Sequence, residues 1–145
     1  MKVLLQRVSE ACVKVDDETI GEIKQGYLLL TGFGHEDQRE NVDKMAEKIC
    51  KLRLFSDDKG KMNLGLNDIQ GQILAVSQFT LYADLSKGRR PSFVDAARPS
   101  EAEALMDWFV QCLKARGYDV QTGKFAAHMK VSLLNDGPVT MMLEN

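Results

Sequence analysis

Short apolar runs, several of them bounded by turn-forming residues, occupy most of this chain and restrict it to sheet-rich folds. Asp16-Asp17 and Gly26 separate some of these runs. The run "QILAVSQFTLYA" is the longest, and we expect it to form one strand over residues 72–83. The other expected strands cover residues 2–8, 11–15, 19–23, 27–33, 51–55, 118–124, 127–134 and 139–144.

Two stretches have helical spacing instead. The first helix is expected to begin at a capping box of Asp37 and Glu40, and the second at one of Ser100 and Glu103, with Gly117 ending the second. The second helix has an apolar stripe that must pack on another surface, most simply a sheet face: Ala102, Leu105, Met106, Phe109 and Leu113. The sequence predicts one α+β domain over residues 1–145, with a largely antiparallel or barrel-like sheet and two main helices.

Length and composition exclude several classes of protein. A chain of 145 residues buries about 70% of its unfolded surface, so its core needs neither a metal nor disulfides. No apolar run approaches the roughly 18 residues of a membrane span, and the N-terminus has no signal-peptide pattern. We therefore expect a cytoplasmic protein with no membrane partner.

Cysteines and histidines form no recognisable site in the sequence. Cys12, Cys50 and Cys112 are widely spaced, and we expect them to fill the core as small apolar residues. His35 and His128 have no carboxylate or thiol at ligand spacing. Neither a metal nor another cofactor is expected.

Polar residues interrupt the longest apolar run at "SQFT", residues 77–80. One interpretation is a half-buried strand whose polar side chains face water. The other is a site built on a hydroxyl or a backbone N–H at the end of the strand. A hydroxyl nucleophile needs a base, but we expect His128 to face solvent and His35 to lie in a loop. A hydrolase of this kind needs a substrate that is already reactive or that supplies its own catalytic group.

Positive charge gathers in the segment "SKGRRPSF". The segment and the residues just after it contain four basic residues, Lys87, Arg89, Arg90 and Arg98, and one acidic residue, Asp95. The chain as a whole has a net charge of −2. The segment is either a solvated loop or a loop that binds phosphates. The acidic total argues against indiscriminate binding of nucleic acid and favours a local contact.

Near the end of the sequence, "NDGPVT" (135–140) places Gly137-Pro138 between two apolar runs, either as a plain corner or as a working piece of backbone. Together with "SQFTL" (77–81), it strongly resembles the D-aminoacyl-tRNA deacylase family. The opening "MKVLLQRVSEACVKV", the "GRRPSF" loop and the ending "TGKFAAHMKVSLLNDGPVT" extend the resemblance over the whole chain. One departure is Ala126, where the family pattern has glycine, and it bears on the local shape of the pocket.

The resemblance implies a homodimeric editing enzyme without cofactors. It would hydrolyse the ester between a D-amino acid and the terminal adenosine of tRNA, and would also act on glycine attached to the wrong tRNA. A Gly-cis-Pro element at Gly137 and Pro138 would enter the active site of the opposite subunit. The resemblance also implies that Ser77, Gln78, Phe79 and Thr80 form the pocket floor. It implies that Phe125 and Met129 line the pocket and that Arg7 supports the inserted element.

Physical reasoning agrees with these implications. A fixed backbone edge beside the substrate Cα would exclude any L side chain, whereas pocket side chains discriminate weakly and can rotate away. Glycine has no side chain to exclude. An aminoacyl ester is labile and has a ribose hydroxyl beside it, which favours RNA-assisted hydrolysis. Backbone N–H groups near Phe79 and Thr80 would then stabilise the oxyanion.

Two other functions stay open at this point. One is a small-molecule hydrolase that uses Thr80 or Ser77 as its nucleophile on D-amino-acid esters or peptides. The other is a nucleic-acid-binding module without catalysis, in which Lys87, Arg89 and Arg90 contact phosphates. The first would not need tRNA, and the second would not turn over an ester.

Overall fold

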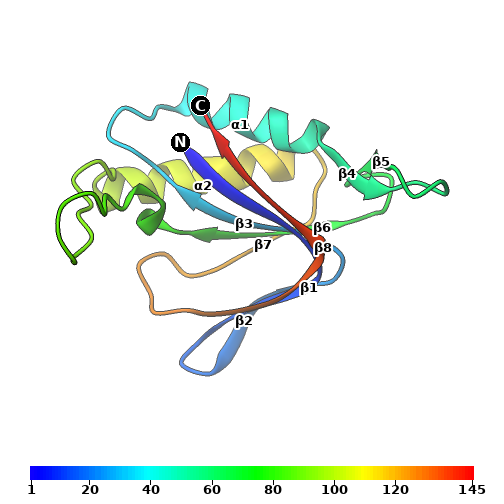
Figure 1. The fold of residues 1–145 in the computed structure, drawn as a ribbon, viewed down its shortest axis with the longest axis horizontal. Coiled ribbons are helices and arrows are strands. Elements are labelled where there is room, and N and C mark those ends of the chain that lie inside the picture. The colour runs from blue at the N-terminus through cyan, green and yellow to red at the C-terminus, as the bar shows by residue number, and fades with distance from the viewer.

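The chain folds into a curved six-stranded sheet with two helices on one face (Figure 1). The computed structural model describes all of residues 1–145. A separate pair of short strands, β4 and β5, lies beside it. The strands are β1 (Lys2–Val15), β2 (Glu18–Ile23), β3 (Gly26–Gly32), β4 (Arg53–Ser56), β5 (Met62–Gly65), β6 (Gln72–Ser77), β7 (Val120–Thr122) and β8 (Lys130–Glu144). The helices are α1 (Arg39–Lys51), the 3₁₀ helix η1 (Phe79–Tyr82) and α2 (Pro99–Ala115).

Strand β1 organises the sheet because it pairs with three other strands, all antiparallel. Its first half, Lys2–Val8, pairs with β3, and Ala11–Val15 pairs with β2. On its other edge β8 follows β1 over almost its whole length. Strands β6 and β7 extend the sheet beyond β3 in parallel order. The sheet is therefore mixed and nearly closed like a barrel, and the predicted α+β class with two main helices is confirmed (Figure 1).

Four of the predicted strands are parts of two long ones: 2–8 and 11–15 lie in β1, and 127–134 and 139–144 fall in β8, which begins only at Lys130. The register between β1 and β8 shifts twice between Gln6 and Glu10. Bulges of this kind bend a strand without ending it. The breaks between these pairs of predicted strands are therefore irregularities within continuous strands.

The predicted apolar stripe of α2 packs on the sheet. Four of its residues are buried, and Leu105 is half-buried against the same core. Opposite them, β3 and β6 contribute Tyr27, Leu29, Ile73 and Ala75. A smaller cluster fills the other face of the sheet: Val8, Ala11, Val13, Ile23, Leu28, Leu74 and Val76. Both faces of the central strands are thus filled, and polar groups of a site can gather only where the strands end.

The capping box predicted for the second helix is wrong. Helix α2 begins at Pro99, with Arg98 as its N-cap and no side-chain cap. Proline suits this first position because its φ is already helical and the N–H it lacks would have had no partner. Ser100 and Glu103 are therefore helical residues and do not cap.

The capping box of α1 lies one residue later than predicted. The Gln38 backbone N–H donates to Asn41 Oδ1 at 3.0 Å. Asp37 is engaged elsewhere, because its carboxylate accepts the Met1 ammonium at 2.5 Å and the Gly34 N–H at 2.6 Å. The predicted strands 51–55 and 118–124 are also shorter, since α1 extends to Lys51 and β7 covers only three residues.

The cysteines differ in environment. Cys112 is buried and its thiol donates to Asp43 Oδ1 at 3.0 Å, and burial raises its pKa to about 11, which disfavours the reactive thiolate. Cys50 is half-buried against the core. Cys12 lies half-buried with its Sγ 3.1 Å from Ser132 Oγ, outside both core clusters, so the core-filling prediction is wrong for Cys12. Neither helix combines the length and apolarity needed to cross a membrane.

Candidate functional site

An apolar cavity of about 630 Å³ opens beside the ends of β3 and β6. Twelve of its 18 lining residues are hydrophobic, so it suits a ligand with a large apolar surface. Its volume lies within the roughly 300–1,000 Å³ typical of small-molecule sites. The walls come from residues 32–33, 76–79, 93–102 and 125–131.

The cavity brings together five of the residues assigned to the site: Ser77, Gln78, Phe79, Phe125 and Met129. They come from two segments far apart in the sequence, the end of β6 and the connection from β7 to β8. Because β6 and β7 are parallel neighbours, the segments that follow them leave the sheet at the same edge. The topology therefore places these side chains together.

The predicted strand over 72–83 is wrong beyond Ser77, where β6 ends and η1 follows. Strand β3, the partner of β6, ends at Gly32, so the chain beyond has no neighbour to pair with. The Gln78 side-chain amide donates to Thr80 Oγ1 across the start of η1. Thr80 is exposed and does not line the cavity.

Unpaired backbone donors lie at the end of β6. The N–H groups of Phe79 and Thr80 open η1, and no acceptor of the chain binds them. His128 is exposed and lines the cavity, whereas His35 Nε2 contacts the Val94 carbonyl. The Thr80 hydroxyl is hydrogen-bonded to the Gln78 amide and to neither histidine. No group of three or more His, Cys, Asp or Glu side chains is arranged to hold a metal ion.

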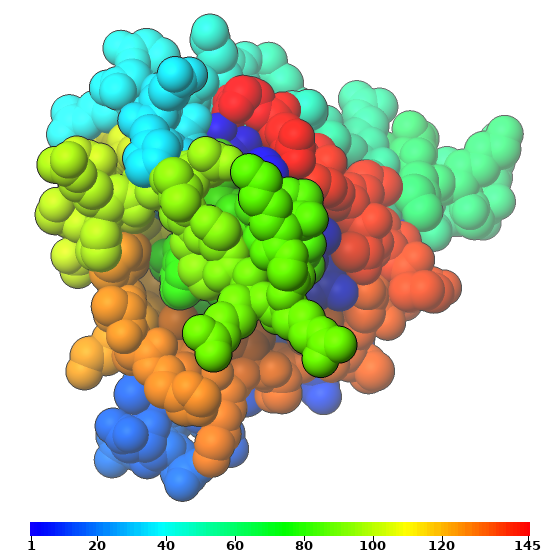
Figure 2. All heavy atoms as spheres, turned by 60° about the vertical axis from the view of Figure 1, so that its left-hand side comes forward, coloured from blue at the N-terminus to red at the C-terminus, as the bar shows by residue number.

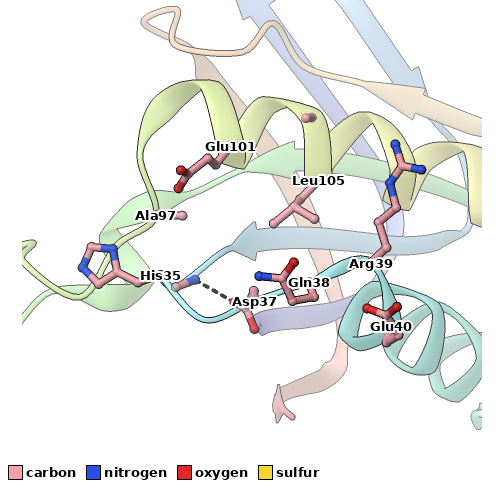
Figure 3. Close-up of a pocket in the computed structure, with 10 residues that line it drawn as sticks. His35, Asp37, Gln38, Arg39, Glu40, Ala97, Glu101 and Leu105 are labelled. Carbon is pink, nitrogen blue, oxygen red and sulfur yellow. Dashed lines mark hydrogen bonds between the residues drawn. The ribbon is translucent and has the colours of Figure 1, made fainter.

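His35 lines a second cavity, of about 470 Å³, between the first turns of α1 and α2 (Figure 3). Figure 3 shows the carboxylates of Glu40 and Glu101 and the guanidinium of Arg39 around it, with Asp37 accepting a backbone N–H. None of the residues assigned to the site lines this cavity. This second cavity differs from the apolar cavity because acidic and basic side chains line it, and the two share only Ala97.

Gly137 and Pro138 lie in a bulge of β8 and do not line the apolar cavity. Strand β8 leaves the register of β1 after Asn135 and regains it at Thr140, so residues 136–139, the β8 bulge, stand opposite a single residue of β1. The Gly137–Pro138 peptide bond is cis, and both residues are exposed. Within one chain, the two parts of the predicted site do not meet.

Arg7 is the β1 residue opposite the β8 bulge, and it braces the bulge from inside. It is 8% exposed, and its Nε donates to the Asp136 carbonyl at 2.9 Å while its Nη1 donates to the Leu54 carbonyl. Asn135 adds a second brace, since its Oδ1 accepts the Val139 N–H at 3.0 Å. The bulge is therefore held in one conformation by its own chain.

The basic segment is an ordered projection. Asp84 and Ser92 exchange backbone hydrogen bonds of 2.8 and 2.9 Å, and residues 84–92, here called the basic finger, form the loop between them. Figure 2 shows this finger, in green, standing out from the surface. It carries three exposed cations that form no ion pair: Lys87, Arg89 and Arg90.

Sequence analysis missed Phe93. This side chain lines the cavity and packs edge to face against Phe79, with ring centroids 4.9 Å apart and planes at 66°. The aromatic residue after the basic run was visible in "GRRPSF", but nothing local joins it to Phe79. The two meet because the basic finger closes between them.

Ala126, the one departure from the family pattern, also lines the cavity. Its φ is 57°, a left-handed conformation that glycine adopts more readily than alanine. The backbone here keeps the shape that the family's glycine would favour. Alanine here adds a methyl group at the cavity wall and holds a backbone conformation that a Cβ disfavours.

A family model described as D-Tyr-tRNA(Tyr) deacylase matches residues 4–144. The chain belongs to this family. The D-aminoacyl-tRNA deacylase of Chloroherpeton thalassium is 59% identical, over 100% of this chain and 96% of its own, and that of Exiguobacterium sp. is 57% identical, over 99% and 98%. A solved structure, that of the c-Myc DNA unwinding element binding protein, is 40% identical with a TM-score of 0.94, over 100% of this chain and 99% of its own.

Membership confirms the predicted enzyme class. The deacylase family hydrolyses the ester of aminoacyl-tRNA, so this chain is a tRNA-editing hydrolase. The residues quoted for the resemblance form both the cavity floor and the β8 bulge. The two motifs that carried the resemblance thus lie in two separate places on one chain.

Replacing Arg7 with methionine should loosen the β8 bulge, because the Asp136 and Leu54 carbonyls lose their donor. We expect a loss of about 1–3 kcal/mol in the free energy of unfolding, measured by urea denaturation. Amide hydrogen exchange at Val139 should accelerate. Arg53→Met is the matched control, since exposed Arg53 makes only a 3.5 Å contact with Asn63. Equal behaviour of the two variants would contradict a bracing role for Arg7.

Proposed function

We propose that this deacylase removes D-amino acids and glycine from tRNA and rejects L-aminoacyl-tRNA by means of main chain supplied by a second subunit. The enzyme works in the cytoplasm as a homodimer, and the Gly137-Pro138 element of each subunit enters the cavity of the other. One observation carries the proposal: the β8 bulge is exposed and braced, yet it lines no part of the cavity in its own chain.

Exposed apolar side chains on β8 support the homodimer. Leu134 is 58% exposed and Met142 is 48% exposed, on either side of the bulge along the strand. Apolar side chains gathered around a braced projection are typical of a surface that another protein covers. Because a twofold dimer uses the same surface on both subunits, one bulge in one cavity implies the reciprocal contact and two complete sites.

The gate acts through the backbone of Gly137-Pro138. A side chain in this place could rotate away from the substrate, but the bulge is fixed by Arg7 and Asn135 through hydrogen bonds to its own main chain. Placed beside the substrate Cα, it excludes every L side chain alike. D side chains point out of the cavity, so they are accepted in variety, and glycine is accepted because it has none.

In the proposed reaction, the substrate supplies the catalytic group that the protein's side chains do not provide. The ribose hydroxyl next to the ester assists hydrolysis, and the free N–H groups of Phe79 and Thr80 bind the developing oxyanion. The Thr80 hydroxyl accepts a hydrogen bond from the Gln78 amide and is hydrogen-bonded to no histidine, which supports positioning over attack. Ser77 and Gln78 form the cavity floor, while Phe125 and Met129 hold the adenosine end by apolar contact.

The basic finger supports a nucleic-acid substrate. Three cations without acidic partners attract phosphates, and Lys87, Arg89 and Arg90 therefore contact the tRNA backbone. A second candidate function, beside hydrolysis, is binding of nucleic acid that carries no ester. It is favoured by the finger and by the likeness to the c-Myc DNA unwinding element binding protein.

Comparing three substrates separates these functions. D-tyrosyl-tRNA should be hydrolysed, L-tyrosyl-tRNA should be slower by a factor above roughly 100, and D-tyrosine methyl ester should not be turned over, because it lacks the ribose hydroxyl. The measurement is the first-order rate of ester loss at fixed enzyme concentration. Rapid hydrolysis of the methyl ester would favour the small-molecule hydrolase. Binding of uncharged tRNA without any turnover would favour the binding module.

Thr80→Ala should retain activity within about tenfold of the wild type, since only the backbone of Thr80 serves the reaction. A D-tyrosyl-tRNA whose terminal 2′-hydroxyl is replaced by hydrogen should react roughly 10²–10⁴ times more slowly, as expected for loss of a general acid–base group. Both rates are measured in single turnover. Near-complete inactivation of a folded Thr80→Ala, with a normal rate for the deoxy substrate, would instead identify Thr80 as the nucleophile.

Mixing two inactive variants tests whether the sites are shared between subunits. In Gly137→Ala the new Cβ would lie 2.8 Å from Val139 Cγ2 at a φ of +132°, and Phe79→Pro removes one oxyanion donor. After subunit exchange, about a quarter of the sites combine an intact cavity with an intact bulge, so about a quarter of wild-type activity should return. Gly60→Ala, at a φ of +74° with open space around it, is the control for backbone strain. No recovery from a mixture shown to contain heterodimers would place the bulge in its own chain's site.

A further inference from the structure

Two aromatic side chains that line the cavity, Phe79 and Phe93, are partly exposed to solvent. Phe79 is 55% exposed, and Phe93 is half-buried beside it in an edge-to-face contact of 4.9 Å. Large aromatic side chains of a soluble protein are seldom left this open without a partner. An edge-to-face pair also leaves at least one ring face uncovered, and such a face can accept a flat group.

The basic finger rises from this ring pair. Residues 84–92 lie between Phe79 and Phe93 in the sequence, and the bridge of Asp84 with Ser92 closes the finger next to Phe93. Figure 2 shows the finger projecting from the surface, with the orange cavity segment near residues 125–131 below it. The finger that carries the unpaired cations therefore begins beside the aromatic pair at one edge of the cavity.

We propose that Phe79 and Phe93 form a stacking platform for the base of the nucleotide that precedes the terminal adenosine, while the basic finger holds the phosphates of the same single strand. The inference rests on the proposed deacylase function. With the aminoacylated adenosine in the cavity, the strand must leave at the rim. There its next base meets the exposed rings and its phosphates meet the finger. Alternating aromatic faces and cations are how proteins hold single strands without reading their sequence.

The positive charge of the basic finger favours a nucleic-acid strand over an apolar protein as the partner of the two rings. An apolar protein partner would have to desolvate three cations that have no acidic partners on this chain. A nucleic-acid strand supplies an anion and a flat ring at each step, so it satisfies both features at once. The platform also sits outside the chirality gate, so it would strengthen binding of D- and L-substrates alike.

Three substrates test the platform with the unmodified enzyme. They are D-tyrosyl-adenosine, the D-tyrosyl trinucleotide that ends in cytidine, cytidine and adenosine, and the same trinucleotide with an abasic sugar before the adenosine. The trinucleotide should have a KM roughly 5- to 50-fold lower than the adenosine ester, as expected for one stacked base. The abasic trinucleotide should lose most of this advantage while kcat stays unchanged. Equal KM values for the abasic and complete trinucleotides would overturn the proposal.

Variants of Phe93 give a second, independent readout. Phe93→Leu keeps apolar volume but removes the ring, so it should raise the KM of the complete trinucleotide roughly 5- to 50-fold more than it raises the KM of the abasic trinucleotide or of the adenosine ester. Phe93→Tyr keeps a ring and should behave as the wild type. A loss of equal size on all three substrates would mean that Phe93 only shapes the cavity, and would overturn the platform.

The proposed function can fail separately from the platform. If the enzyme hydrolyses none of the three D-tyrosyl esters and no D-tyrosyl-tRNA, the deacylase mechanism itself is wrong. If it hydrolyses D-tyrosyl-adenosine and the trinucleotides with the same KM, the deacylase stands and the platform is rejected.

Discussion

The pairing of β1 with β8 breaks opposite one buried residue, Arg7, and the proposed reaction depends on that break. A buried guanidinium is stable only when its donors are bound. Here they bind the carbonyls of Asp136, in the β8 bulge, and of Leu54, at the start of β4. The same side chain therefore ties three separate segments together, and it holds the bulge outward as a feature of the folded sheet. Under the proposed mechanism, this brace and the Asn135 brace give the bulge the fixed position that exclusion of one hand of a substrate requires.

Parallel pairing explains where the cavity lies. Strands β3, β6 and β7 run in the same direction, so their carboxyl ends meet at one edge, and the segments after them form the cavity walls. Ligands of α/β sheets commonly bind outside the carboxyl ends of parallel strands. In this chain the long antiparallel pair of β1 and β8 presents the bulge elsewhere on the same sheet. One fold thus provides a receptor surface and a projecting element on the same chain.

The sequence was informative where a pattern repeats and uninformative where contacts are distant. The stripe of α2 was predicted because it recurs at helical spacing, and four of its five residues are buried. The end of β6 was not predicted, because "SQFTLYA" continues the alternation typical of a strand. The strand ends there because its neighbour β3 ends at Gly32 and offers no further pairing. The capping box at Asp37 failed for a similar reason, because the Met1 ammonium, remote in sequence, occupies the carboxylate. The site residues themselves came from the family resemblance, and Phe93 escaped because its partner lies beyond the finger.

A gate made of backbone fits the absence of a base at Thr80. An enzyme with its own activated nucleophile would attack any ester that reaches it, so its selectivity would have to come from weak side-chain contacts. When the substrate's own ribose provides the reactive group, the protein needs only to admit and orient it. Placement then decides both rate and chirality: a ligand that the bulge displaces loses its alignment with the N–H groups of Phe79 and Thr80. Under the proposed mechanism, the displacement that excludes an L side chain also withholds the oxyanion contact from its ester, so rejection and catalysis would be one geometric property of the proposed dimer.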